Sequence, residues 1–243
     1  MITTIAIVMA MEAEAAPVVD AFGARPVAVP AGRPHRWYLA SRAGARVVVA
    51  VNGRDARFGV DGVGPEPAVM NTVATIERFR PDLVVSAGTA GGWVARGGAI
   101  GAVYLSYPHV VRHDRRIDLD GFREFGVGRF PVVPMRAVAA AIGAEPGVVT
   151  TGGSLDETPE DARIMAELDA RAKEMEAASV AWVCETLGVP FVALKTITDL
   201  ADVAHPTATQ FEANLHTASA QLTEHLLGFV DAVAGRAVDE LDR

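Results

Sequence analysis

Cysteine is nearly absent from the 243-residue chain, which limits both disulfide and metal chemistry. The single Cys184 cannot form an internal disulfide, and the sequence has no CxxC pair and no Cys/His set at zinc-binding spacing. The six histidines never pair with one another at metal-ligand spacing. We therefore expect no metal site, and a protein of a reducing compartment.

Long apolar runs are also missing. No stretch approaches the roughly 18 to 20 apolar residues of a membrane span. Residues 2–10 are apolar, but no basic region precedes them and Glu12 and Glu14 follow at once, so they do not resemble a signal peptide. These absences predict a cytoplasmic protein with no membrane partner.

Positive charge is in deficit, since 22 Lys and Arg stand against 30 Asp and Glu, giving a formal net charge of −8. A protein that binds nucleic acid through its phosphates needs a concentrated basic surface. Nucleic acid is therefore not an expected partner. The 50% hydrophobic content excludes a chain that is mainly disordered.

Common nucleophile and cofactor motifs are absent as well. The sequence has no GxSxG elbow and no GxxxxGK[ST] phosphate loop. Gly62-Val63-Gly64 is followed by Pro67 where a dinucleotide-binding fingerprint would need its third glycine. Neither a nucleotide cofactor nor a metal is expected.

Short apolar, β-branched runs are present, and they lack polar alternation. Such runs are typical of strands covered on both faces of a sheet. The predicted strands are 5–9, 47–51, 83–85, 103–105, 148–150 and 191–197. Helical patterns lie between them, near 11–22, 65–79, 156–170 and 176–187. The alternation predicts an α/β fold, with one domain over 1–235.

A long C-terminal helix completes this domain. Thr207 and Gln210 have the spacing of a capping box at its start. Its apolar stripe should pack on the sheet, and consists of Phe211, Leu215, Leu222, Leu226, Phe229 and Val233. The charged tail 236–243 should fray.

The region 109–134 is the longest one without strong periodicity, and it contains three phenylalanines: Phe122, Phe125 and Phe130. Long ordered loops are usually functional, so the region is a candidate lid or interface segment.

Carboxylates follow two of the predicted strands. Glu12 and Glu14 come after the first strand, and Asp199 and Asp202 after the last. Because ligands bind outside the carboxyl ends of parallel strands, these groups are candidates for one site. Simpler explanations exist: an acidic residue in a first helical turn stabilises the helix dipole, and Asp199 could be a helix N-cap.

Two further segments are candidates for the same site. The glycine-rich stretch 86–92 follows another strand, and its small residues would let a ligand approach the backbone closely, although it could also be only a tight connection. Glu174 and Glu176 flank Met175 at the expected start of a helix, where Met175 could equally belong to the core.

Four motifs span nearly the whole chain. They are Met11-Glu12-Ala13-Glu14, Ser86-Ala87-Gly88-Thr89-Ala90-Gly91-Gly92, Glu174-Met175-Glu176-Ala177-Ala178 and Thr196-Ile197-Thr198-Asp199-Leu200-Ala201-Asp202. In order and spacing they resemble the motifs of the 5'-methylthioadenosine/S-adenosylhomocysteine nucleosidases, within the purine nucleoside phosphorylase superfamily. Further segments resemble the plant-type branch of this family: Gly53-Arg54-Asp55-Ala56, His113-Asp114-Arg115-Arg116-Ile117, Gly126-Val127-Gly128, Ser154-Leu155-Asp156 and Pro206-Thr207-Ala208.

The resemblance implies a role for each matching residue. Glu14 would activate the attacking water, and Asp199 would protonate adenine at N7. The resemblance also implies a set of substrate-binding residues: Glu176 on the ribose hydroxyls, Met175 against the sugar, Thr89 and Thr198 along the site, Gly88 in the glycine-rich stretch, and Leu155 where many bacterial members have a phenylalanine against the purine.

The chemistry suits these residue types. Breaking an N-glycosidic bond builds positive charge on the sugar and negative charge on the base, so the reaction needs an acid on the base side and a base on the water side. With water as nucleophile, no cofactor is required. The resemblance further implies a mixed, largely parallel sheet flanked by helices, a small-molecule nucleoside substrate, and a homodimer in which the region 109–134 reaches the other subunit's site.

Two alternatives stay open. One is a phosphorylase on the same fold. Related phosphorylases carry an arginine at the position of Ser86, and in this sequence only Arg54 leaves phosphorolysis open. The other is a non-enzymatic nucleoside-binding α/β domain. The sequence also leaves open which 5' substituent is preferred, methylthio or homocysteinyl.

Overall fold

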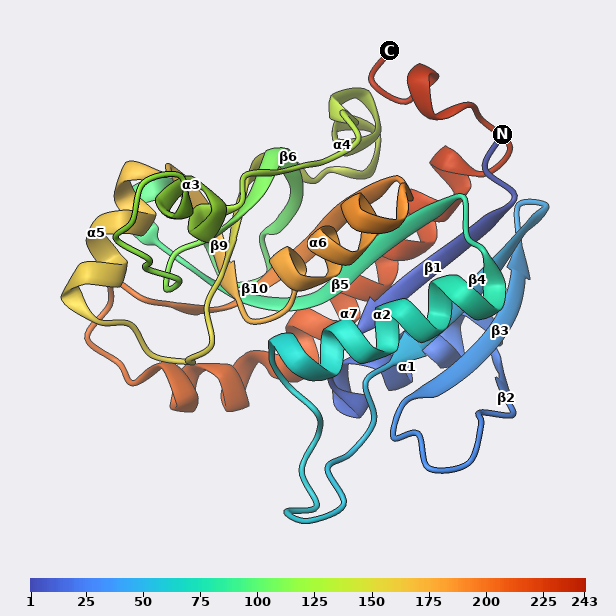
Figure 1. Cartoon of the computed structure of the whole chain (residues 1–243). Helices are drawn as coiled ribbons and strands as arrows, with labels where there is room; N and C mark the ends of the chain where they lie inside the picture. The colour runs from blue at the N-terminus through green and yellow to red at the C-terminus, as the bar shows by residue number, and fades with distance from the viewer.

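The computed structural model describes residues 1–243, in which strands and helices alternate along most of the chain (Figure 1). The strands are β1 (Thr4–Met9), β2 (Arg25–Val27), β3 (Arg36–Arg42), β4 (Ala45–Val51), β5 (Leu83–Gly92), β6 (Val103–Arg112), β7 (Phe130–Pro131), β8 (Glu145–Thr151), β9 (Ala170–Glu174) and β10 (Phe191–Leu200). The helices are α1 (Glu12–Phe22), α2 (Pro65–Phe79), α3 (Phe122–Val127), α4 (Arg136–Ile142), α5 (Pro159–Glu167), α6 (Ala177–Leu187) and α7 (Thr207–Val233), with short 3₁₀ turns at Val94–Arg96 and Val238–Glu240.

All six predicted strands are confirmed, and two of them extend into the motifs expected to follow them. β5 continues through the glycine-rich stretch to Gly92, and β10 continues through Asp199 to Leu200. The expectation that these segments lie beyond the strand ends is wrong, because their backbones stay paired with each other: Gly91 is in register with Asp199.

The strands form one mixed sheet, and half of it closes on itself. β1 lies between two parallel neighbours, β4 and β5, while β3 and β2 extend the sheet in antiparallel fashion. β5, β10, β6, β8 and β9 pair in a ring, because both β9 and β10 bond to β5. The predicted mixed sheet flanked by helices is thus confirmed.

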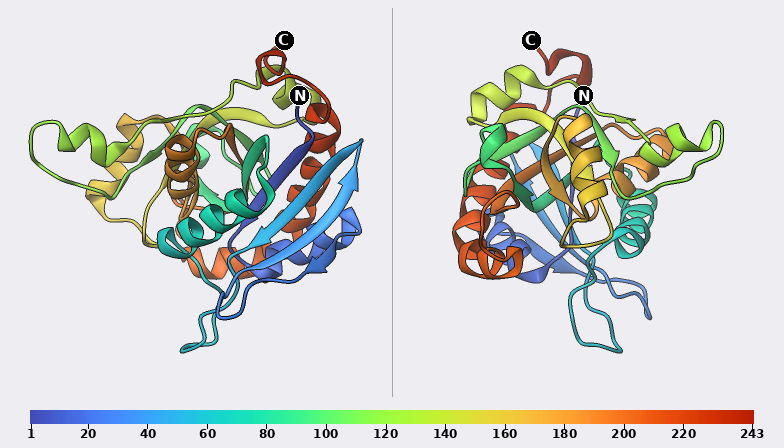
Figure 2. Two further views of the ribbon diagram at one scale, coloured as in Figure 1. Left: turned by 45° about the vertical axis from the view of Figure 1, so that its right-hand side comes forward. Right: turned by 90° about the vertical axis from the view of Figure 1, so that its left-hand side faces the viewer.

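Two helical layers cover the sheet. α1, α4 and α7 bury Val18, Val138 and Phe229 against one face, and α2 and α6 bury Ile76 and Val180 against the other (Figures 1 and 2). Each large apolar side chain fully buried in this way contributes about 1.5–3 kcal/mol to folding. None of the helices is both long enough and apolar enough to span a bilayer.

The start of α7 differs from its prediction. The helix begins after Pro206 without a side-chain cap, so the capping box of Thr207 and Gln210 does not form. The Gln210 amide instead bonds the backbone N–H and C=O of Leu200, at 3.1 and 3.2 Å. Phe211 and Leu215 also leave the predicted stripe, since neither belongs to the buried core and Phe211 lines a cavity.

The tail 236–243 does not fray. Leu241 is completely buried and belongs to the core beneath α7. The Asp242 carboxylate accepts from the backbone and guanidinium of Arg136, and the Arg236 carbonyl accepts from the N–H of Ile2 at 2.8 Å. The prediction of a frayed tail was therefore wrong, because one buried leucine and several hydrogen bonds hold these charged residues in place.

Candidate active site

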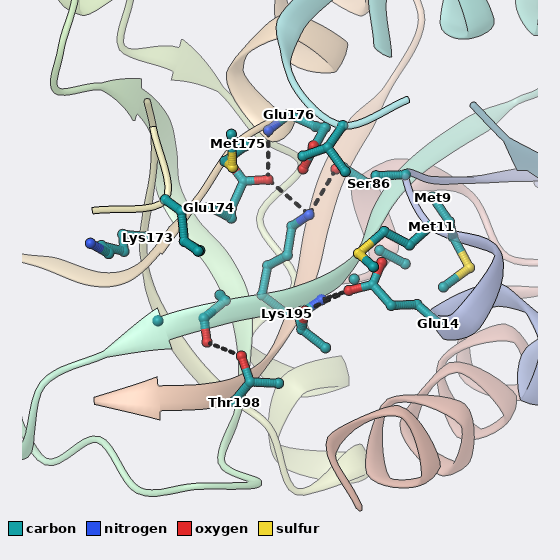
Figure 3. A pocket seen from close by; sticks show the side chains of 18 of the residues that line it. Met9, Met11, Glu14, Ser86, Lys173, Glu174, Met175, Glu176, Lys195 and Thr198 are labelled. Carbon is teal, nitrogen blue, oxygen red and sulfur yellow. Dashed lines mark hydrogen bonds and ion pairs between the residues drawn. The ribbon is translucent and has the colours of Figure 1, made fainter. Parts of the chain in front are cut away.

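A cavity of about 380 Å³ opens where β1, β5, β9 and β10 end (Figure 3). Parallel strands bring their carboxyl ends to one edge of a sheet, which is why motifs far apart in the sequence meet there. The structure brings every site residue named from the sequence to the lining of this cavity: Glu14, Gly88, Thr89, Leu155, Met175, Glu176, Thr198 and Asp199.

Glu14 projects from the first turn of α1 and is only 4% exposed. Its Oε1 accepts from the backbone N–H of Thr89 at 2.8 Å and from the Thr89 hydroxyl at 2.5 Å. The backbone of Gly88 packs against the same carboxylate, since a Cβ there would lie 3.4 Å from Oε2. A buried carboxylate fixed by two donors does more than stabilise a helix dipole. Glu12, by contrast, points outside the cavity and pairs with Arg36.

Asp199 lies on β10 and is 2% exposed, so it is no helix N-cap. Its Oδ1 accepts from the Thr198 hydroxyl at 2.9 Å, while Oδ2 is buried without a hydrogen-bond partner. Burial raises the pKa of this carboxyl, and the Thr198 hydrogen bond and the charge of Lys173 only partly offset that effect. A carboxyl with a raised pKa that lines a cavity is suited to donate a proton to a ligand.

Glu174 ends β9, and Met175 and Glu176 connect it to α6, with Glu176 at the N-cap, so the motif opens a helix as expected. The Glu174 carboxylate accepts from the backbone N–H of Ala177 at 2.8 Å and so caps α6. The Glu176 Oε1 accepts from the N–H of Gly64 at 2.8 Å. Burial, followed by the repulsion of Glu174, raises the pKa of Glu176. Met175 is half-buried at the wall of the cavity.

Lys195 is a site residue that the sequence reasoning missed. It is 1% exposed, and its ammonium lies 2.9 Å from Glu174 Oε2 and 3.2 Å from Ser86 Oγ (Figure 3). Burial opposes its charge, but Glu174 and Glu176 outweigh burial and raise the pKa of Lys195. A lone lysine inside an apolar strand was the available signal, because a buried cation needs a buried anion. Lys173 and His113 also line the cavity unpredicted.

Arginine, a common bidentate phosphate ligand, is missing from the cavity, and the lysines that line it are already paired with carboxylates. Ser86 faces Lys195, and no arginine lines the wall. The guanidinium of Arg54 donates to the carbonyl of Gly59 within its own loop. The anionic Glu14 would also repel a phosphate bound beside it.

The region 109–134 is more ordered than its sequence pattern suggested. It includes the end of β6, the short α3 and β7, and Phe130 is buried in the core. Phe122 and Phe125 on α3 stay about half exposed, at 51% and 52%. Figure 2 shows the segment between β6 and α3 projecting from the body of the protein.

Comparison with known proteins places this geometry in a family. The model of the Phosphorylase superfamily matches residues 4–231. The chain is 37% identical to 5'-methylthioadenosine nucleosidase of Arabidopsis thaliana, covering 99% of this chain and 91% of that protein. It is 33% identical to the 5'-methylthioadenosine/S-adenosylhomocysteine nucleosidase of the same plant, covering 99% and 95%.

Solved structures agree. The apo structure of the Arabidopsis thaliana 5'-methylthioadenosine nucleosidase matches with a TM-score of 0.96 at 36% identity, covering 99% of both chains. Futalosine hydrolase of Helicobacter pylori shares the fold alone, with a TM-score of 0.77 at 24% identity, covering 96% of this chain and 99% of that one. The chain belongs to the 5'-methylthioadenosine/S-adenosylhomocysteine nucleosidases, a family of N-glycosyl hydrolases within the phosphorylase superfamily.

Proposed function

We propose that this protein hydrolyses the N-glycosidic bond of 5'-methylthioadenosine and related 5'-substituted adenosines, with Asp199 as general acid and Glu14 as general base. One observation carries the assignment: two buried carboxyls line one cavity in contrasting hydrogen-bond surroundings. Asp199 keeps a buried oxygen without a partner, whereas Glu14 is held by two donors from Thr89. The nucleosidase identity of the relatives supports the same reaction.

Asp199 acts on the base side. As the bond between C1' and N9 breaks, negative charge develops on the purine, and a proton from Asp199 to N7 neutralises it. The raised pKa suits this task because the carboxyl must carry its proton into the reaction. The Thr198 hydroxyl on Oδ1 orients the carboxyl so that Oδ2 is the oxygen left for the ligand.

Glu14 acts on the water side. Its carboxylate takes one proton from a water molecule, whose oxygen bonds to C1' while adenine departs. The products are adenine and the free 5-substituted ribose, and the two transferred protons balance. The donors from Thr89 hold Oε1 in place, so that no reorganisation is needed when charge moves.

The sugar lies between these two groups. We assign Glu176 to the ribose hydroxyls, because its carboxylate is fixed at one oxygen by Gly64 and lines the same wall. Met175 offers an apolar surface to the ring, and we assign Leu155, which is 45% exposed at the rim of the cavity, to the purine.

Conservative variants test the acid and base assignments. Asp199→Asn keeps the shape but has no proton to release, and Glu14→Gln has no site for the proton of water. Each should lower kcat for adenine release by about two to four orders of magnitude. Near-normal turnover by a folded Asp199→Asn protein would refute the assignment.

We also propose that the protein works as a homodimer in the cytoplasm. The exposed pair Phe122 and Phe125 on the projecting α3 supports a partner, since apolar side chains are costly to leave in water. The single unpaired Cys184 suits a reducing compartment. Light scattering with activity measured across dilution tests the dimer: a monomer that is fully active at all concentrations would contradict it.

A further inference from the structure

Lys173 is a cavity-lining cation to which the proposed reaction gives no role. Its side chain is only 7% exposed, and Figure 3 shows it across the cavity from Glu14. Its ammonium lies 3.1 Å from Glu157 Oε2. Glu157 belongs to the link between β8 and α5, which also carries Leu155 to the rim of the cavity.

The strand register places this lysine beside the proton donor. Lys173 on β9 and Asp199 on β10 are both in register with Gly91 on the strand between them, β5. Side chains directly opposite one another project from the same face of a sheet. Because Gly91 has no side chain, the side chains of Asp199 and Lys173 occupy the space above it. A Cβ at this position would lie 2.7 Å from Asp199 Oδ2 and 3.2 Å from Lys173 Cγ.

Two charged groups act on Asp199, and they have opposite signs. The positive charge of Lys173 favours the ionised carboxylate and lowers its pKa, whereas the negative charge of Glu157 raises it; both are smaller effects than burial. The ion pair therefore places two charges of opposite sign near the unpartnered Oδ2, and the effect of Lys173 is the larger. Without Glu157, the charge of Lys173 would lower the pKa of the Asp199 carboxyl further.

We propose that Lys173 and Glu157 are positioning residues for the proton donor: their opposite charges offset one another at Asp199, and their ion pair ties the rim segment with Leu155 to the cavity wall. The proposal rests on the assignment of Asp199 as general acid. Neither residue exchanges a proton with the substrate. The pair acts through the charge environment of Asp199 and through the place of the segment between β8 and α5.

Opposite charge changes separate this role from a purely structural one. Lys173→Met removes the cation, so the alkaline limb of kcat/KM for adenine release should move up by roughly one pH unit. Glu157→Gln removes the anion, so the limb should move down by a similar amount. The double variant should return the limb close to that of the parent protein, and Lys173→Arg, which keeps the charge, should leave it in place.

The same proteins are titrated by ¹³C NMR of labelled aspartate carboxyls, and the Asp199→Asn variant identifies the signal of Asp199. This experiment measures the proton affinity of Asp199 independently of catalysis. Shifts of opposite sign in the two single variants support the proposal. Shifts of equal sign, or none, overturn it, even where adenine is still released. Absence of adenine release by the parent protein would overturn the proposed function instead. Should Lys173→Met fail to fold, the downward shift in Glu157→Gln, a change at a partly exposed residue, decides the matter.

Discussion

Gly91 is the position where one added methyl group should disturb the chemistry most selectively. In Gly91→Ala the new Cβ would lie 2.7 Å from Asp199 Oδ2 and 3.2 Å from Lys173 Cγ. Non-bonded heavy atoms prefer roughly 3.5 Å. The Asp199 carboxyl must therefore withdraw by most of an ångström, against the 2.9 Å hydrogen bond that holds it to Thr198. A misplacement of about 1 Å costs roughly 100-fold in rate.

The expected result is a kcat for adenine release reduced by about 100-fold, with a smaller change in KM, because the lost interaction acts mainly in the transition state. Steady-state kinetics with 5'-methylthioadenosine measures both, and circular dichroism checks the fold. Gly228→Ala is the matched control: it lies inside α7, where a Cβ would meet only Ile142 at 3.5 Å. A folded Gly91→Ala protein with near-parental kcat would refute the placement of Asp199 at the reacting base.

Three further outcomes follow from single contacts. Glu12→Gln should leave turnover nearly unchanged in the adenine assay, because that carboxylate pairs with the exposed Arg36 outside the cavity. Leu241→Ala should lower the free energy of unfolding by about 2–5 kcal/mol, measured by urea denaturation, since the side chain is fully buried. Burial opposes ionisation of Asp161, but the Arg116 guanidinium and two hydrogen bonds from Thr158 together outweigh it and lower the pKa to about 2. That carboxylate therefore stabilises the fold above about pH 4 and loses this effect as the pH falls toward 2, so thermal unfolding of Asp161→Asn should depend less on pH in that window.

The sequence predicted the site better than it predicted the boundaries of its strands. Runs of apolar β-branched residues indicated β1, β5 and β10, and the convergence of parallel strands at one edge brought Glu14, Gly88 and Asp199 together as expected. The extensions of β5 and β10 were missed because glycine and aspartate are rare inside strands. In this protein Gly88 and Gly91 of β5 and Asp199 of β10 lie inside strands because they line the cavity.

Buried charged residues were the main feature that hydrophobic periodicity did not predict. β9 reads as a polar segment, ARAKE, yet Lys173 and Glu174 are 7% exposed and each has a charged partner. Hydrophobic periodicity cannot register such a strand, because ion pairs take the place of apolar contacts. Lys195 was missed for a different reason: its strand was predicted, but one lysine in an apolar run does not change the pattern. The tail was missed because its anchor, Leu241, is a single apolar residue among charges.

The identity of the nucleophile is the most direct test of the account. Purified protein is incubated with 5'-methylthioadenosine in phosphate-free buffer and then with added phosphate, and the products are resolved by chromatography. The Glu14 carboxylate lines the cavity and no arginine does, so we expect adenine and free 5-methylthioribose at the same rate in both buffers. A sugar 1-phosphate product, or adenine release that requires phosphate, would contradict the account.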